Sequence, residues 1–248
     1  MSQKIRQDQI LQILEKQGYA TVRHLVEQLH YSSATINRDL NAMEALRLVK
    51  RSYGGVEIAK RGNLPALQER QFYMKKEKRR VAKAAAALIQ NGETIFLDGS
   101  TTVQYIIPFL AEKRDLCVIT NNMRLAIELG GLDMEVICLG GHIAERPHVL
   151  SGDDTVETAQ KYQANKMFFS VDSVTIGGYI HSTYHLLYKT MLQNSDEAYF
   201  LTDQTKISDR LDKKLCDFSK ISGVISDFDF PQETKSRYPN TKFIFAAE

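Results

Sequence analysis

Apolar residues recur at helical spacing in two neighbouring stretches near the N-terminus. In the first stretch positions i, i+3, i+4 and i+7 are apolar, at Val22, Leu25, Val26 and Leu29. In the second, the apolar stripe consists of Ile36, Leu40 and Met43. Ser32 stands directly before the second stretch, where serine is a favourable N-cap. The pattern predicts two consecutive helices around a break at His30–Tyr31, with an earlier helix over residues 6–17 to support them.

The second of these helices has a polar face of uncommon composition. An ordinary surface helix would carry mainly Glu and Lys there, whereas this one carries short hydrogen-bonding side chains and one Arg. These are the residue types that contact base edges and phosphates in a major groove. The residues on this face are Ser33, Thr35, Asn37, Arg38 and Asn41.

Two short strands are predicted next, Leu48–Arg51 and Val56–Ile58, and the turn Ser-Tyr-Gly-Gly between them makes a β-hairpin. Two helices and a hairpin in this order predict a winged helix-turn-helix over residues 1–58. The alternative is a small helical subdomain with a solvated face, which does not explain the polar face and the hairpin together. The candidate DNA-binding residues are Ser32, Ser33, Thr35, Asn37, Arg38, Asn41, Arg51 and Tyr53. Thr35, Asn37 and Arg38 are expected to read bases, and Arg51 to contact the DNA backbone.

From Glu77 onward, apolar runs of strand length alternate with stretches of about helix length. Such alternation predicts a largely parallel sheet with helices on both faces, and ligands at the carboxyl ends of its strands. An Ala-rich helix over Val81–Gln90 opens this second domain, residues 77–248, and residues 59–76 are interpreted as a linker. The predicted strands are Thr94–Asp98, Leu116–Asn121, Glu135–Leu139, Met167–Val171, Ala198–Thr202, Val224–Asp227 and Phe243–Ala246.

Composition adds a charge asymmetry. Residues 1–80 hold 16 Lys and Arg against 8 Asp and Glu, whereas residues 81–248 hold 16 against 22. This division is typical of a polyanion-binding module joined to a body that does not bind nucleic acid. The sequence has no apolar run of transmembrane length and no signal-peptide pattern, which predicts a cytoplasmic protein. Cys117 and Cys138 lie in apolar runs and are expected to be buried, inert thiols.

The first strand of the second domain ends in the loop Asp98–Thr102, directly before a predicted helix. A glycine, three hydroxyls and the free N–H groups of a helix N-terminus favour an oxyanion, although the same loop is also a good N-cap. Thr120-Asn121-Asn122 ends the second strand and Gly140-Gly141 the third, so these segments meet at one edge of the sheet.

The N-terminal motif supports a family resemblance. The pattern Ser32-x-x-Thr35-Ile36-x-Arg38-Asp39-Leu40, followed by Arg51-x-x-Gly54-Gly55, resembles the signature of DeoR-type bacterial transcriptional regulators. The family usually has a basic residue where Asn37 stands here and a His where Tyr53 stands. Both differences lie on the expected DNA face and concern the operator sequence rather than the fold.

The second domain resembles the sensor domain of the same family, which is similar to the ribose-5-phosphate isomerase fold. The matching segments include Glu77-Lys-Arg, the Asp98–Thr102 loop, Leu139-Gly140-Gly141, Gly152, Lys166–Phe168 and Asp203-x-x-Lys206. The resemblance implies a sugar-phosphate effector. The candidate effector-binding residues are Asp98, Gly99, Ser100, Thr101, Thr102, Thr120, Asn121, Gly141, Arg146, Asp172, Lys189, Asp203 and Lys206.

Within this set, the phosphate is expected on the Asp98–Thr102 loop, with Lys189 and Lys206 supplying positive charge. Asp98 would repel phosphate and is expected to hold sugar hydroxyls or the loop itself. Three positions after Gly141 the family usually has an Arg, but this chain has Ala144. After the fourth strand the family commonly has Gly-Ile-Asp, but this chain has Ser173-Val174-Thr175. These departures leave open an unusual effector or weak sensing.

The other groups of polar residues in the sequence indicate neither a metal site nor a catalytic centre. The pairs His181/His185 and His142/His148 fall in predicted loops without further ligand spacing, so no metal is expected. No cofactor is expected either. Asp98, Asp172, Lys189, Asp203 and Lys206 include groups able to transfer protons on a sugar phosphate, but no base and acid pair stands out.

The sequence therefore predicts a transcription factor that represses sugar-metabolism genes and responds to a phosphorylated sugar. Its partners are double-stranded operator DNA, the effector and further copies of the chain in a dimer or tetramer, because paired major-groove contacts need sites about 34–36 Å apart. Two alternatives remain: a sugar-phosphate isomerase with an accessory DNA module, and a regulator that has lost small-molecule sensing.

Overall fold

The computed structural model describes residues 3–17, 19–45, 48–52, 55–58, 74–143, 148–182, 184–208 and 213–246. The chain divides into two compact units, Met1–Arg70 and Gln71–Glu248, called here the N-terminal unit and the C-terminal unit. The predicted fold class is confirmed, with a helix-turn-helix and a small antiparallel sheet in the first unit and a parallel α/β sheet in the second. Among the described residues, none of the helices has the length and apolar character needed to cross a membrane.

The N-terminal unit packs three helices on a three-stranded antiparallel sheet with strand order β1-β3-β2. Its elements are α1 (Gln3–Gln17), β1 (Tyr19–Thr21), α2 (Val22–Leu29), α3 (Ser33–Ala45), β2 (Val49–Ser52) and β3 (Gly55–Ile58). The three predicted helices and the predicted hairpin are present, and the strand β1 is an addition that the sequence did not indicate. The buried core includes Ile10, Leu14, Leu25, Ile36, Leu40, Met43, Val49 and Val56.

Local hydrogen bonds fix the turn between α2 and α3. His30 has φ 57° and its backbone N–H donates to the carbonyl of Val26 at 3.0 Å, which ends α2. Ser32 Oγ then accepts from the backbone N–H of Thr35 at 3.2 Å, so the predicted N-cap of α3 is confirmed. A buried ion pair between Arg6 and Asp39 joins α1 to α3, with Nε and Oδ2 2.6 Å apart.

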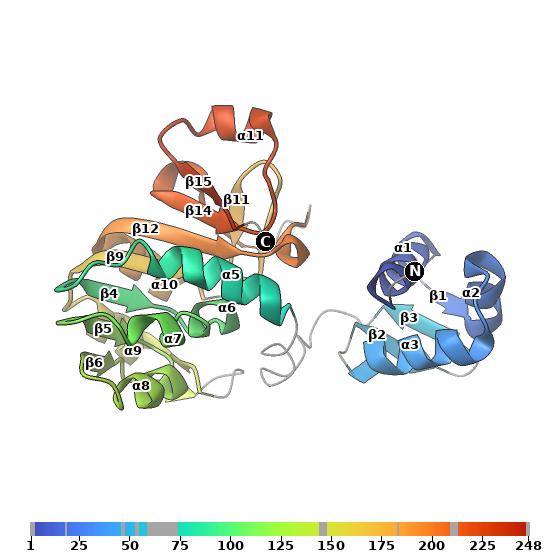
Figure 1. The fold of residues 1–248 in the computed structure, drawn as a ribbon, viewed down its shortest axis with the longest axis horizontal. Helices are drawn as coiled ribbons and strands as arrows, with labels where there is room; N and C mark the ends of the chain where they lie inside the picture. The colour runs from blue at the N-terminus through green and yellow to red at the C-terminus, as the bar shows by residue number, and fades with distance from the viewer. Residues whose placement is uncertain are drawn as a thin grey trace. The chain divides into compact units, whose positions relative to one another are not determined.

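All seven predicted strands form one sheet in the C-terminal unit, in the order β15-β14-β12-β9-β4-β5-β6 (Figure 1). Every neighbouring pair is parallel. The strands are β4 (Thr94–Leu97), β5 (Cys117–Thr120), β6 (Glu135–Cys138), β9 (Ala164–Phe169), β12 (Ser195–Thr202), β14 (Gly223–Ser226) and β15 (Lys242–Phe245).

Helices cover both faces of this sheet, as predicted (Figure 1). On one face lie α5 (Lys75–Ala86), α6 (Thr101–Gln104), α7 (Ile107–Leu110) and α8 (Met123–Leu129). On the other lie α9 (Asp153–Ala159) and α10 (His185–Gln193). The remaining short elements are α11 (Gln232–Arg237), the 3-10 turns η1 (Gln204–Lys206) and η2 (Phe218–Lys220), the hairpin β7 (His142–Ile143) and β8 (Leu150–Ser151), and the small sheet of β10 (Ser173–Val174), β11 (Tyr179–His181) and β13 (Lys214–Asp217).

Three local expectations were wrong. The Ala-rich helix begins at Lys75 rather than Val81, because the charged residues before it are good helix formers without an apolar pattern. Of the two cysteines expected to be buried, Cys117 is only partly buried and Cys138 is exposed, since β6 is an edge strand of the sheet. The histidines expected in loops at positions 142, 181 and 185 instead lie in β7, β11 and α10.

Candidate functional sites

The polar face predicted on α3 is exposed or partly exposed. Arg38 and Asn41 are exposed, whereas Thr35 and Asn37 are half-buried. Arg38 forms no hydrogen bond or ion pair with any residue that the structure describes, so its guanidinium is available to a ligand. The hydroxyl of Ser32, in contrast, caps the N-terminus of α3 and contacts Thr35 Oγ1 at 2.9 Å.

Arg51 lies against this face rather than pointing away from the hairpin. Its Nη2 donates to Asn37 Oδ1 and its Nη1 to Asn41 Oδ1, both at 2.6 Å. Asn37 Nδ2 donates in turn to the carbonyl and hydroxyl oxygens of Ser33, at 2.9 and 3.2 Å. Three of the predicted DNA-binding residues on α3 are therefore linked to a fourth on β2. Tyr53, also predicted, lies outside the described residues.

In the C-terminal unit, the carboxylate of Asp98 organises the loop that follows β4. Its Oδ1 accepts from the backbone N–H and the hydroxyl of Ser100 at 3.2 and 2.7 Å. Its Oδ2 accepts from Tyr188 Oη at 2.6 Å and from the backbone N–H of Ser170 at 3.3 Å. Burial raises the pKa of Asp98 above its usual range, although the hydrogen bonds from Tyr188 and Ser100 oppose this shift. Of the two predicted roles, the structure has Asp98 holding the loop.

Ser100 is also committed to the loop, because its hydroxyl accepts from the backbone N–H of Val103 at 3.2 Å while donating to Asp98. It caps α6, a helix of only four residues. The predicted contribution of a helix dipole to anion binding is therefore small at this position, since the dipole sums over aligned peptide units.

Two lysines from different elements converge on the next two threonines of this loop. Lys78 on α5 is 4% exposed, and its Nζ donates to Thr101 Oγ1 at 3.2 Å. Lys206, at the end of η1, donates from Nζ to Thr102 Oγ1 at 3.4 Å and to Ser170 Oγ. Lys206 was predicted from the sequence as an effector-binding residue, whereas Lys78 was named only within the family-matching segment Glu77-Lys-Arg. The arrangement places two positive charges beside two hydroxyls.

The neighbouring strand ends also reach this edge. Thr120 Oγ1 accepts from the backbone N–H of Asn122 at 3.1 Å, and Asn121 Nδ2 donates to the carbonyl of Leu150 at 3.0 Å. Asn121 Oδ1 is buried and has no hydrogen-bond partner among the described residues. A Cβ on Gly99 would lie 2.8 Å from a methyl of Val149, so a glycine lets the loop approach this segment.

Gly141 has φ 122°, and a Cβ there would lie 2.0 Å from Thr155 Oγ1. Thr155 donates to the carbonyl of Gly140 at 2.6 Å, so the glycine pair packs against the start of α9. This requirement for glycine is structural.

Four further residues were predicted to bind the effector: Asp172, Lys189, Asp203 and Arg146. Asp203 is buried and accepts from the backbone N–H of Thr205 at 3.0 Å, which shapes the turn that carries Lys206. Asp172 is half-buried, and Arg146 lies outside the described residues. Lys189 is exposed on α10 and forms no hydrogen bond or ion pair within the described part of the chain. The structure therefore does not join Lys189 to the Asp98–Thr102 loop.

Asp227, at the end of β14, is a neighbour of this region that the sequence did not indicate. Its Oδ1 accepts from the backbone N–H of Gln204 at 2.8 Å. Burial raises the pKa of Asp227, and so do the nearby carboxylates of Asp203 and Glu77, whereas Arg80 lowers it. The helix α5 packs against β12 and β14.

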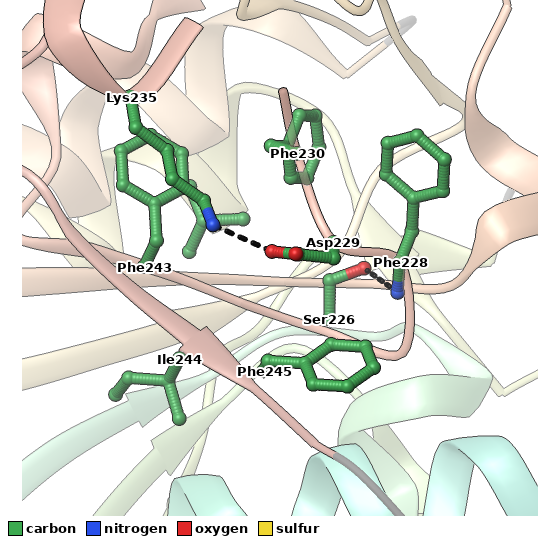
Figure 2. Close-up of a pocket in the computed structure, with 9 residues that line it drawn as sticks. Ser226, Phe228, Asp229, Phe230, Lys235, Phe243, Ile244 and Phe245 are labelled. Atoms are coloured by element: carbon green, nitrogen blue, oxygen red, sulfur yellow. Dashed lines mark hydrogen bonds and ion pairs between the residues drawn. The ribbon is translucent and has the colours of Figure 1, made fainter. Parts of the chain in front are cut away.

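Two hollows elsewhere are not suited to an effector. Figure 2 shows the first, between Phe228, Phe230 and Phe243 beside the ion pair of Lys235 and Asp229, with a volume of about 10 Å³. That volume holds about one water molecule. The second is open, has a volume of about 700 Å³ and is lined by residues 114–117 and 132–135, which precede or begin β5 and β6. It therefore lies at the amino ends of these strands, opposite to the usual ligand position. Among the described residues, no group of three or more His, Cys, Asp or Glu side chains is arranged to hold a metal ion.

The helix-turn-helix and the α/β unit with its polar edge together define a DNA-binding transcriptional regulator with a sensor domain, and not an enzyme. The chain belongs to the DeoR family: residues 6–61 match the DeoR-like helix-turn-helix domain and residues 74–228 the DeoR C terminal sensor domain. The first match implies DNA binding and the second a small-molecule effector.

Curated relatives resemble the chain over nearly its whole length. It is 27% identical to the lactose phosphotransferase system repressor of Staphylococcus aureus (strain NCTC 8325 / PS 47), over 95% of this chain and 96% of the relative. It is 26% identical to the glycerol-3-phosphate regulon repressor of Escherichia coli (strain K12), over 92% of each chain. Among solved structures, ribose 5-phosphate isomerase A from Methanocaldococcus jannaschii matches with a TM-score of 0.42 and 18% identity, over 56% of each chain.

Proposed function

We propose that this protein represses genes of sugar metabolism and that a phosphorylated sugar, bound in the C-terminal unit, alters its affinity for operator DNA. The names of two relatives support this proposal, since one is a repressor of a lactose phosphotransferase system and the other of a glycerol-3-phosphate regulon. A two-fold oligomer would place two copies of α3 in successive major grooves.

The observation that carries the effector proposal is the convergence of Lys78 and Lys206 on the loop after β4. Each lysine donates to a threonine hydroxyl, and each hydroxyl keeps its own hydrogen to donate to an anion. Because α6 is too short for a strong dipole, a phosphate dianion needs these two cations for its charge. Thr101 and Thr102 then position the phosphate between them.

The sugar would extend toward the ends of β5 and β6. Asn121 Oδ1 is a buried acceptor without a donor among the described residues, and leaving such a group unsatisfied costs about 1–3 kcal/mol. A sugar hydroxyl would supply that donor. Asp98 is unavailable for this role, since both of its oxygens already accept hydrogen bonds from the protein.

The test is a thermal-shift screen with phosphorylated sugars and their unphosphorylated counterparts. We expect a phosphorylated sugar to raise the melting temperature of the wild-type protein and not that of Thr101→Asp, which places a carboxylate at the phosphate position. Ser236→Asp, at an exposed position of α11, is the matched control and should respond as wild type does.

An equal shift in Thr101→Asp and wild type would show that the phosphate binds elsewhere. No shift with any sugar phosphate would instead favour a regulator that has lost small-molecule sensing.

A further inference from the structure

The side chain of Arg51 is fixed on α3 at two points. Asn37 and Asn41 are one helical turn apart, a spacing that brings their side chains within about 5–6 Å of each other. Their two amide oxygens accept from the two Nη atoms of Arg51, both at 2.6 Å. The backbone of Arg51 is held as well, because its N–H donates to Glu44 Oε1 at 2.9 Å and its strand pairs with Val56. The guanidinium therefore has a defined position and orientation.

These contacts hold the guanidinium without neutralising it. Both acceptors are uncharged amides, and among the described residues no carboxylate pairs with the Arg51 side chain. Arg6 in the same unit differs, since its guanidinium is paired with the buried carboxylate of Asp39. A guanidinium has five N–H donors, so after one hydrogen bond to each amide Arg51 keeps three. Arg51 is half-buried, so part of the residue remains accessible, and these two contacts leave three of its donors unused.

Asn37, in contrast, has both ends of its amide occupied. Its Oδ1 accepts from Arg51, and its Nδ2 donates to the carbonyl and hydroxyl oxygens of Ser33. Paired contact of an Asn with adenine requires both the amide oxygen and the amide nitrogen. Asn37 would have to break these bonds to make that contact, whereas Arg51 can contact a base without losing any.

We propose that Arg51 reads a guanine in the operator and that Asn37 and Asn41 are positioning residues that aim it. The planar fork of a guanidinium matches O6 and N7 of guanine, which is the commonest specific contact between a side chain and a base. This proposal replaces the expected backbone contact of Arg51, and it rests on the proposed use of α3 as the DNA-reading helix.

A guanine contact and a phosphate contact respond differently to Arg51→Lys. Lysine keeps the positive charge but loses the planar fork. If Arg51 contacts a phosphate, lysine largely replaces it, and removal of the charge weakens all sequences alike while lowering the salt dependence of binding. If Arg51 reads guanine, lysine loses the preference for one base at one operator position.

The experiment selects binding sites for the full-length protein from randomised duplex DNA, then measures affinity for the selected site and its single-base variants. Wild type should prefer guanine at one position by about 5- to 150-fold. Arg51→Lys, Asn37→Ala and Asn41→Ala should each reduce this preference at the same position. The double variant Arg51→Lys/Asn41→Ala should lose no more than Arg51→Lys alone, because the residues act as one unit.

Arg23→Lys is the matched control, because Arg23 is exposed on α2 and paired with Glu27, and it should keep the wild-type preference. Melting temperatures of all variants establish that they are folded. The proposal is overturned if folded Arg51→Lys keeps the guanine preference, or if Arg51→Ala weakens every sequence equally. Failure of wild-type protein to select any sequence would instead contradict the proposed function.

Discussion

Replacement of Lys78 by methionine should separate effector binding from stability. Lys78 is 4% exposed, and its ammonium group donates to Thr101 Oγ1 at 3.2 Å, on the loop where we place the phosphate. Methionine has a similar length and flexibility but no charge. In the effector-free protein, the variant loses the hydrogen bond to Thr101, with a net value of about 1 kcal/mol, and it also avoids the cost of burying an ammonium group. These changes oppose each other, so we expect little change in melting temperature.

Effector binding should respond much more strongly. A hydrogen bond to a charged partner contributes about 1.5–3 kcal/mol, which corresponds to a loss of about 10- to 150-fold in affinity for the sugar phosphate. Thermal shift across an effector titration, checked by calorimetry, measures this loss. Lys83→Met is the matched control, since Lys83 lies on the same helix but is exposed, and its affinity should be that of wild type.

The reasoning is refuted by the opposite pattern. If Lys78→Met lowers the melting temperature of the effector-free protein and binds sugar phosphate as tightly as wild type, Lys78 is a structural residue. The anion site would then have to be placed elsewhere.

Three further predictions concern other residues. Arg38→Ala should weaken binding to the selected operator by about 5- to 150-fold in an anisotropy assay, because its exposed guanidinium is lost from the DNA face; unchanged affinity would remove it from that face. Tyr188→Phe should lower stability in denaturant titrations, and more at neutral than at acid pH. The lost hydrogen bond stabilises the ionised form of Asp98, and burial raises the pKa of that carboxyl. A pH-independent loss would contradict this. Arg6→Met should lower the melting temperature of the N-terminal unit, since it leaves the Asp39 carboxylate buried without its cation; an unchanged transition would show that the pair is dispensable.

The sign of the pH effect follows from the direction of the shift. Burial raises the folded-state pKa of Asp98, so the folded protein binds this proton more readily than the unfolded chain. The contribution of Asp98 to stability is therefore largest below its unfolded-state pKa and falls as pH rises through the folded-state pKa. The hydrogen bond from the Tyr188 hydroxyl reduces this loss of stability. Its removal therefore lowers stability mainly at pH values where the Asp98 carboxylate is ionised.

The sequence indicated the main sheet well because its central strands are buried on both faces. In β4, for example, Phe96 packs in the core on one face and Leu97 in the core on the other, and this gives a continuous apolar run. Apart from β13 (Lys214–Asp217), which has four residues, the strands that escaped prediction, such as Tyr19–Thr21 and His142–Ile143, have only two or three. Runs of that length carry no usable periodicity.

The candidate sites were only partly predictable. The loop Asp98–Thr102 could be found because a strand, a glycine and hydroxyl residues are adjacent in sequence. The contact of Lys78 with Thr101 spans 23 residues and that of Arg51 with Asn37 spans 14, so both depend on how separate elements pack. The family-matching segment Glu77-Lys-Arg contains Lys78, but nothing in its sequence shows that this lysine, rather than Arg79, contacts the loop.

The central claim is that a phosphorylated sugar on the Asp98–Thr102 loop controls DNA binding. The most direct measurement is the operator affinity of wild type and Thr101→Asp, with and without the sugar phosphate found in the screen. A coupling free energy of about 1–3 kcal/mol predicts a change of about 5- to 150-fold for wild type, no change for Thr101→Asp, and similar effector-free affinity for both. The same effector-induced change in both proteins, or none in wild type, would contradict the claim.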